Sequence, residues 1–143
     1  MIEGGCLCKG VRYRAGAAPL TVRACWCRFC QYIAAGNAAI GLAFPRASVT
    51  ITGTMSDYAT LADSGSHMHR RFCPTCGVHM FSEAEERPHL IFVRAGTLDD
   101  PSLVAPTTVI WAAHAPKWVK IDPDCVRFEG QPPPLPECLE HVR

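Results

Sequence analysis

Seven of the nine cysteines fall into three short elements, and their spacing restricts the fold more than any other feature. The elements are residues 6–8 (Cys-Leu-Cys), 25–30 (Cys-Trp-Cys-Arg-Phe-Cys) and 73–77 (Cys-Pro-Thr-Cys-Gly). Two sulfurs in one tight turn, or on one face of a strand, can hold a single zinc ion. The odd number of cysteines also excludes a chain in which every thiol is paired in an internal disulfide.

The cysteines divide into ligand sets in more than one way. Structural zinc takes four ligands in a tetrahedron, whereas catalytic zinc keeps one position open. One division gives a closed four-sulfur site from Cys6, Cys8, Cys73 and Cys76. It leaves a local trio with an open fourth position: Cys25, Cys27 and Cys30. Spacing alone also permits a four-sulfur site made of Cys25, Cys27, Cys73 and Cys76.

Composition and charge exclude several classes of protein. The chain has 143 residues, of which 48% are hydrophobic and 19% charged, so it is not intrinsically disordered. The formal net charge is +1 before any metal binds, and thiolates on two zinc ions would make it slightly negative. A nearly neutral chain is a poor general binder of nucleic acid, so we expect no nucleic-acid partner.

The N-terminus and the hydropathy of the chain lead us to expect a cytoplasmic protein. Residues 1–5 have no basic segment followed by an apolar run, which an ordinary secretory signal requires. Charged residues interrupt every apolar stretch before it reaches membrane-spanning length, so no membrane partner is expected. In a reducing compartment, clustered cysteines are more often metal ligands or reactive groups than disulfides.

Short alternating or apolar segments separated by turn residues predict an all-β fold with at most short helices. Residues 28–35 lack Gly and Pro and predict the one helix. Strands are predicted over residues 11–14, 20–24, 37–44, 48–52, 58–61, 69–72, 78–82, 90–95, 107–113 and 118–121. No linker separates two globular parts, so one domain is expected over residues 1–130.

The last residues differ from the rest of the chain. Residues 131–143 contain four prolines, which predict an extended tail rather than a helix. Cys125 and Cys138 lie outside all three cysteine elements. We expect both to be ordinary thiols, with Cys138 exposed to oxidation.

The three elements, with their neighbours, resemble the glutathione-dependent formaldehyde-activating enzyme family, which includes the centromere protein V type. The similar segments are residues 6–13, the trio, residues 71–81 (Arg-Phe-Cys-Pro-Thr-Cys-Gly-Val-His-Met-Phe) and residues 95–101. The resemblance implies a β-tent fold of the Mss4-like type. It also implies a structural zinc at Cys6, Cys8, Cys73 and Cys76, and a second, catalytic zinc at Cys25, Cys27 and Cys30.

The resemblance further implies a carbon–sulfur lyase that joins formaldehyde to glutathione as S-hydroxymethylglutathione. This chain has Gln31-Tyr32 where many family members carry Arg-Lys, so the identity of the thiol stays open. Arg28 lies within the trio and could stabilise the charge that develops on the aldehyde oxygen. Two other functions stay open: a zinc-binding module for protein or nucleic acid, and a thiol redox protein.

Several residues near the elements are weaker candidates. His67, His69 and His79 flank the third cysteine element and could complete the open site or act as a base, although surface histidines are common. Arg70-Arg71 could bind a substrate carboxylate, but an ordinary surface pair is the favoured interpretation. Trp26, Phe29 and Tyr32 could line a pocket around the trio, while Trp111 and Trp118 are expected in the core.

Overall fold

The computed structural model describes residues 1–135, which form eleven strands, one short α-helix and four 3-10 turns. The helix is α1, Arg28–Ile33. The strands are β1 (Ile2–Gly5), β2 (Arg12–Ala15), β3 (Thr21–Cys25), β4 (Ala39–Pro45), β5 (Val49–Thr52), β6 (Ser56–Leu61), β7 (His67–Phe72), β8 (His79–Ala84), β9 (Leu90–Arg94), β10 (Thr108–Ile110) and β11 (Val126–Arg127).

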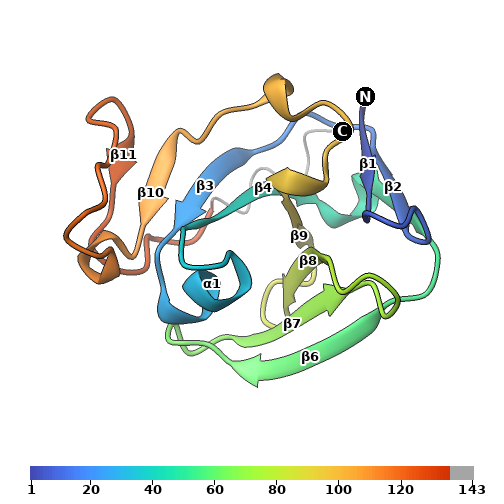
Figure 1. Ribbon diagram of the computed structural model, residues 1–143, viewed down its shortest axis with the longest axis horizontal. Helices are drawn as coiled ribbons and strands as arrows, with labels where there is room; N and C mark the ends of the chain where they lie inside the picture. Colours follow the sequence, from blue (N-terminus) through green and yellow to red (C-terminus); the bar gives the residue numbers. More distant parts are fainter. Residues whose placement is uncertain (136–143) are drawn as a thin grey trace.

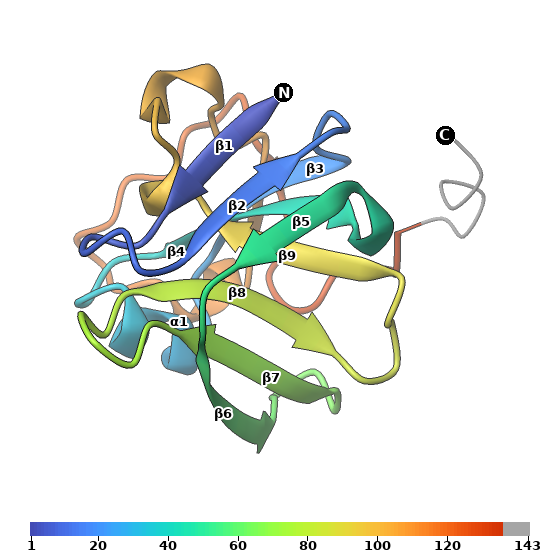
Figure 2. The same ribbon diagram turned by 90° about the vertical axis from the view of Figure 1, so that its right-hand side faces the viewer.

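These strands form two sheets. The smaller sheet has the order β1-β2-β5 and is antiparallel (Figure 2). The larger sheet has the order β11-β10-β3-β4-β9-β8-β7-β6, and its pairs are antiparallel except β10 with β3 and β10 with β11. The larger sheet curves strongly, and α1 lies inside the curve (Figure 1). The predicted all-β, Mss4-like fold class is therefore confirmed.

The main core lies between the smaller sheet and one face of the larger sheet. Its fully buried side chains include Tyr13 from β2, Leu42 and Phe44 from β4, and Phe81 from β8. The Tyr13 hydroxyl hydrogen-bonds the Thr97 hydroxyl at 2.8 Å, so this buried polar group is satisfied. Because strand side chains alternate between faces, the neighbours of these core residues point into the curve around α1.

The strands differ from the predictions in several places: β11 was not predicted, and the strand predicted over residues 107–113 is only three residues long, Thr108–Ile110. Residues 2–5 form β1, which was not predicted because two of its four residues are glycine. Residues 118–121 form a turn and irregular backbone, so the strand predicted there is wrong. Trp118 is 68% exposed rather than part of the core, although its ring packs edge-on against buried Trp26. Trp111 is half-buried.

The end of the described chain lies near the curved face. Residues 131–135 form neither helix nor strand, and Pro132 is buried. The rest of the predicted tail, including Cys138, lies outside the described residues. The predicted boundary at residue 130 stays a prediction. Within residues 1–135 no helix is long and apolar enough to cross a membrane.

Candidate metal centres

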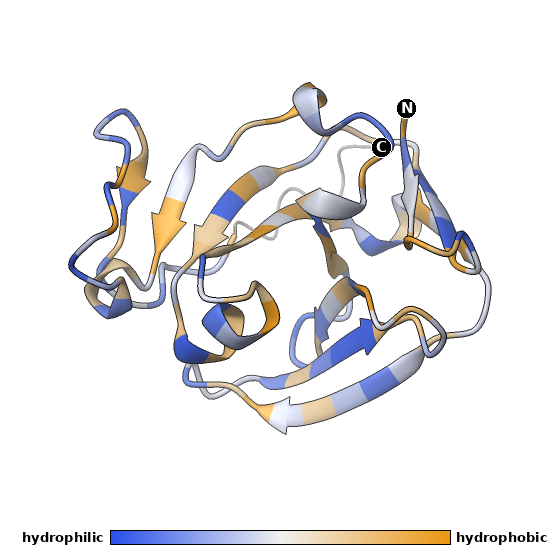
Figure 3. Cartoon of the chain, viewed as in Figure 1, coloured by the Kyte–Doolittle hydropathy of each residue, from blue (hydrophilic) through white to orange (hydrophobic). Residues whose placement is uncertain are grey.

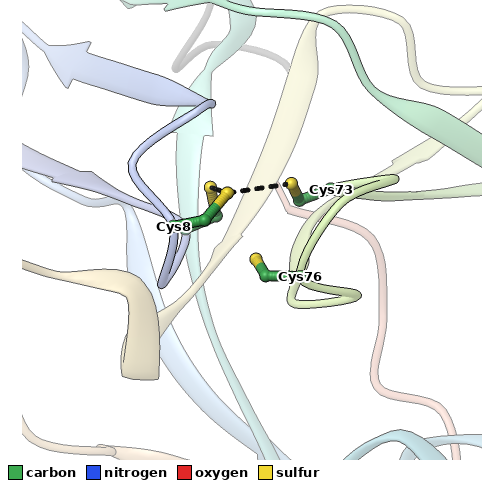
Figure 4. Close-up of side chains that lie close together, drawn as sticks. Cys8, Cys73 and Cys76 are labelled. Atoms are coloured by element: carbon green, nitrogen blue, oxygen red, sulfur yellow. Dashed lines mark hydrogen bonds between the residues drawn. The ribbon is translucent and has the colours of Figure 1, made fainter.

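One cluster of four sulfurs links the two sheets. It joins the β1–β2 connection to the β7–β8 connection, as the facing side chains of Cys8, Cys73 and Cys76 show (Figure 4). Its ligand atoms, from Cys6, Cys8, Cys73 and Cys76, all lie within 4.8 Å of one another. Cys8 Sγ is 3.6 Å from both Cys6 Sγ and Cys73 Sγ. Tetrahedral zinc with Zn–S bonds near 2.3 Å requires sulfurs about 3.8 Å apart, so the cluster fits this ion.

The two connections have similar backbone geometry. The amide of Cys6 donates to the Val11 carbonyl at 3.0 Å, and the amide of Cys73 donates to the Val78 carbonyl, also at 3.0 Å. Each connection turns through one residue with positive φ, Lys9 at 66° and Gly77 at 75°. The turn in each case brings two sulfurs to the same side, ready to share one ion.

Backbone amides in these turns also point at sulfur. The amide of Val11 donates to Cys6 Sγ at 3.2 Å. Hydrogen bonds from the amides of Cys8 and Val78 lower the pKa of Cys76 to about 6. Amide donors of this kind favour the thiolate, which is the form that binds a metal. These turns thus supply both the sulfurs and the amide donors that favour metal ligation.

The second cluster lies where β3 ends and α1 begins. Cys25 is the last residue of β3, Cys27 is the N-cap of α1, and Cys30 lies in the first turn of the helix. Cys27 Sγ accepts a hydrogen bond from the Cys30 amide at 3.4 Å, so one side chain caps the helix and faces the other sulfurs. Their three sulfurs lie within 4.8 Å of one another and could hold a metal ion.

The electrostatics of the trio favour a bound cation. Hydrogen bonds from Cys25 and Cys30 hold the pKa of Cys27 well below its ordinary value. Hydrogen bonds to Cys27 and Cys30 raise the pKa of Cys25 strongly, because a second negative charge at this distance is unfavourable. A compensating positive ion would stabilise all three thiolates together. The donor set of three sulfurs suits zinc.

The trio lies on the wall of an open cavity of about 540 Å³, which is lined by the larger sheet, α1, the connection after β6 and residues 131–135. Apolar side chains including Phe29, Leu90, Phe92 and Ile110 form part of the lining. Five arginines and one acidic residue, Asp63, also line it. The arginines are Arg23, Arg28, Arg70, Arg87 and Arg94.

Strand register explains why three of these arginines face the same cavity. Arg23 on β3 lies opposite Gly41 on β4, which in turn lies opposite Arg94 on β9. Residues opposite each other in an antiparallel pair share a face, so this row points into the cavity together with Cys25. On β7, Arg70 lies opposite Ser82 of β8, which lies opposite Phe92 of β9.

The structure settles the division of cysteines left open by spacing. Cys73 and Cys76 meet Cys6 and Cys8, while Cys25 and Cys27 lie with Cys30. The alternative four-sulfur site is therefore wrong. Cys125 lies outside both clusters, and its Sγ donates to the Pro106 carbonyl at 3.4 Å.

The residues beside the trio take different roles. The Arg28 guanidinium donates to the side-chain oxygen of Gln31 at 2.6 Å and lies over the Tyr32 ring. Gln31 is buried and donates to the Trp26 carbonyl at 2.8 Å, so it fixes α1 rather than facing the cavity. Phe29 and Tyr32 line the cavity as considered from the sequence, whereas Trp26 packs in the core.

The histidines considered as ligands lie elsewhere. His67 pairs with Glu86, and His69 lies between Asp57 and Glu85. Within residues 1–135, neither histidine belongs to a group of potential metal ligands. His79 stacks on Phe72 with ring centres 5.6 Å apart.

The Arg70-Arg71 pair was expected to be an ordinary surface pair, and half of that expectation is wrong. Figure 3 shows β7 as a mostly hydrophilic strand. Arg71 points away from the cavity and pairs with Glu83. Arg70 is 5% exposed, lines the cavity and lies over the Phe29 ring at 3.5 Å.

Sequence reasoning missed Arg23 and Arg94 altogether. Alternation along the segment Thr21–Cys25 would have placed Arg23 on the same face as Cys25. Arg94 ends an apolar strand, and only the pairing of β9 with β4 brings it to the trio. No local signal in the sequence indicates that contact.

Comparisons with known proteins bear on the fold and the family of the chain. A crystal structure of a Rhodobacter sphaeroides protein, a structural genomics target, is similar with a TM-score of 0.54 and 20% sequence identity. The similarity covers 73% of this chain and 91% of that one, and at this identity it shows the fold. A comparison with curated proteins gives no significant match. The family model described as glutathione-dependent formaldehyde-activating enzyme matches residues 1–114. The chain therefore belongs to the glutathione-dependent formaldehyde-activating enzyme family.

Proposed function

We propose that this chain is a zinc-dependent carbon–sulfur lyase and synthase that acts on a small thiol–aldehyde adduct similar to S-hydroxymethylglutathione. One observation carries the proposal: three convergent sulfurs line a cavity of about 540 Å³, large enough for a small adduct. The four-sulfur cluster, by contrast, joins two connections and has a complete ligand set. We assign a structural zinc to the four-sulfur cluster and a catalytic zinc to the trio.

The residues of the trio suit this chemistry. Cys25, Cys27 and Cys30 would hold the ion, which supplies a Lewis acid that keeps a thiol deprotonated near neutral pH. In the synthetic direction, the thiol loses its proton and its sulfur forms a bond to the aldehyde carbon. The carbonyl electron pair moves to oxygen, which takes up a proton and becomes the hydroxyl of the adduct. Cleavage reverses these steps.

The chain provides the surroundings of the reacting atoms. Arg70 and Arg94 have electrostatic interactions with Cys27 and Cys30, so positive charge lies next to the trio. Such charge favours the thiolate forms of these cysteines. Arg28, which also lines the cavity, is the candidate that would stabilise an alkoxide as it develops on the aldehyde oxygen. Phe29 and Phe92 contribute apolar wall, which lowers the local dielectric and strengthens these interactions.

The compartment and partners follow from the same proposal. A small thiol is the expected partner, with no nucleic acid or membrane involved. A cytoplasmic location agrees with the eight cysteines within residues 1–135, which form no disulfide there.

Exchange measurements test the activity despite the uncatalysed reaction between thiols and formaldehyde. NMR exchange spectroscopy can measure the interconversion of glutathione and S-hydroxymethylglutathione at equilibrium. The zinc-loaded protein should raise the exchange rate above the protein-free rate, and the Cys27→Ser variant should return it to that rate. Equal rates with wild type, variant and buffer, across several thiols and aldehydes, would refute the lyase and favour a binding or redox role.

A further inference from the structure

The arginines in the cavity are more numerous than the trio requires. With one zinc, three thiolates carry a single net negative charge. Five arginines and only one carboxylate line the same cavity within the described residues. The cavity therefore has excess positive charge, which an anionic ligand would neutralise.

Three of these arginines also have unsatisfied hydrogen-bonding atoms. Arg23 Nε, Arg70 Nη1 and Arg94 Nε are buried, and none has a hydrogen-bond partner in the part of the chain that the structure describes. Arg70 is the strongest case, because only 5% of the residue is exposed and its guanidinium faces the cavity. Buried charged donors without partners are unfavourable, so they are rare unless a ligand completes them.

The arrangement of the three suits a planar anion. Arg23 and Arg94 stand on either side of Gly41, in one row across three neighbouring strands. Gly41 has no side chain, and a Cβ there would lie 3.8 Å from Arg94 Nη1 and 3.3 Å from the Phe92 ring. The glycine thus leaves room between the two guanidinium groups. Guanidinium forks match carboxylates with paired hydrogen bonds.

The aromatic rings keep the guanidinium groups in place. Arg70 lies over the Phe29 ring at 3.5 Å, and Arg23 lies over the Phe92 ring at 5.8 Å. Stacking of this kind orients the planar group and leaves its edge free to bind a ligand. The Ser82 residue, buried and opposite Arg70, adds a hydroxyl to the same lining.

We propose that Arg23, Arg70 and Arg94 form an anion subsite that binds a carboxylate of the thiol substrate beside the trio. The preferred thiol therefore carries a carboxylate, and a neutral thiol of the same size binds less well. The inference rests on the proposed function, since it names the class of thiol that this site takes. Under this proposal, Arg70 binds the substrate and is not an ordinary surface residue.

A matched pair of probes tests the subsite without any reaction. N-acetyl-S-methylcysteine and its amide differ only in one carboxylate, and neither has a free thiol that could bind the metal. NMR titration of the zinc-loaded protein should show the acid binding at least tenfold more tightly than the amide. Equal binding of the two probes, or binding of neither, would overturn the proposal.

Variants of the arginines test which side chains cause the preference for the acid over the amide. Arg94→Gln and Arg70→Gln should each reduce the preference for the acid to less than threefold. Arg71→Gln is the matched control, because this neighbour pairs with Glu83 on the opposite face and should keep the full preference. If Arg70→Gln does not fold, Arg23→Gln replaces it. A tenfold preference that survives in Arg94→Gln and the second variant would refute the assignment.

Failure of the anion subsite and failure of the proposed lyase activity give different results. Selective binding of the acid without exchange catalysis would keep the subsite and refute the reaction. Catalysis that is equally fast for N-acetylcysteine and N-acetylcysteine amide, with no difference in probe binding, would keep the reaction and refute the subsite.

Discussion

Loss of a sulfur from the four-sulfur cluster should destabilise the fold far more than loss of a sulfur from the trio. The first cluster links residues that are 65 positions apart, Cys8 and Cys73. The trio spans only the residues from Cys25 to Cys30. We therefore compare Cys73→Ala with Cys27→Ser, in which the serine hydroxyl can still cap α1.

The expected difference follows from the lengths of the loops that each cluster closes. Each cluster can be treated as a cross-link that lowers the entropy of the unfolded chain. The resulting stabilisation is about 4 kcal/mol for the long loop and about 2 kcal/mol for the short one. Cys73 is also 2% exposed and packs in the main core, so its truncation adds a packing loss. Against a total stability of roughly 5–15 kcal/mol, Cys73→Ala removes a large share.

Thermal and urea unfolding of the zinc-loaded variants measure this difference. We expect Cys73→Ala to lower the Tm by roughly 8–16 °C, or to prevent folding, and Cys27→Ser to lower it by about half as much. Cys125→Ala is the control, because this thiol lies outside both clusters and should cost under about 1.5 kcal/mol. If Cys27→Ser destabilises the protein as much as Cys73→Ala does, the division into structural and catalytic sites is wrong.

Three further predictions concern the cavity, the surface and a turn. Gly41→Val should weaken the binding of N-acetyl-S-methylcysteine at least tenfold, because the valine side chain fills the space beside Arg94. NMR titration measures this binding, and elemental analysis should show no loss of zinc. NMR titration of His69 should give a pKa above 6.5, since hydrogen bonds with Asp57 and Glu85 raise it, and Asp57→Asn should lower it. The stabilisation that protonated His69 gains from these two carboxylates is complete below pH 6.5. It is lost as the pH rises through the pKa of His69 in the folded state. Gly53→Ala should cost more than about 1 kcal/mol in urea unfolding, because φ is +102° and a Cβ would lie 2.1 Å from a carbonyl oxygen.

Each of these has a clear contrary result. Unchanged ligand affinity in Gly41→Val would mean that the ligand does not lie between the two arginines. A pKa of His69 at or below 6.5 would show that its carboxylate partners are not bound in solution. A fully stable Gly53→Ala would contradict the close approach of this turn to the β1–β2 connection.

The sequence predicts the members of the two cysteine clusters well because their spacing is local. Two sulfurs in one turn, or three within six residues, need no knowledge of tertiary structure to be recognised. Most of the strands were predicted for the same reason, because alternation along residues such as Val49–Thr52 is a local pattern. Which pairs of cysteines meet across the fold is a tertiary property, so spacing left it open.

The arginine lining could not be predicted in the same way. The inward face of Arg70 depends on its register opposite Ser82, and the position of Arg94 depends on the pairing of β9 with β4. The error at Trp118 has a similar cause, since its ring covers Trp26 from outside while most of the residue stays exposed. A charged residue in a strand predicts a side chain exposed to solvent. In this fold, the curvature of the larger sheet places several such side chains in the cavity instead.

Zinc content per chain, measured by elemental analysis of protein purified without tags or chelators, tests the central claim most directly. The claim is that a complete structural site and a second metal site on the cavity wall occur together. Two zinc ions per chain in the wild type, and one in Cys27→Ser, are the predicted result. One zinc per chain in both proteins would contradict a metal-dependent reaction at the trio.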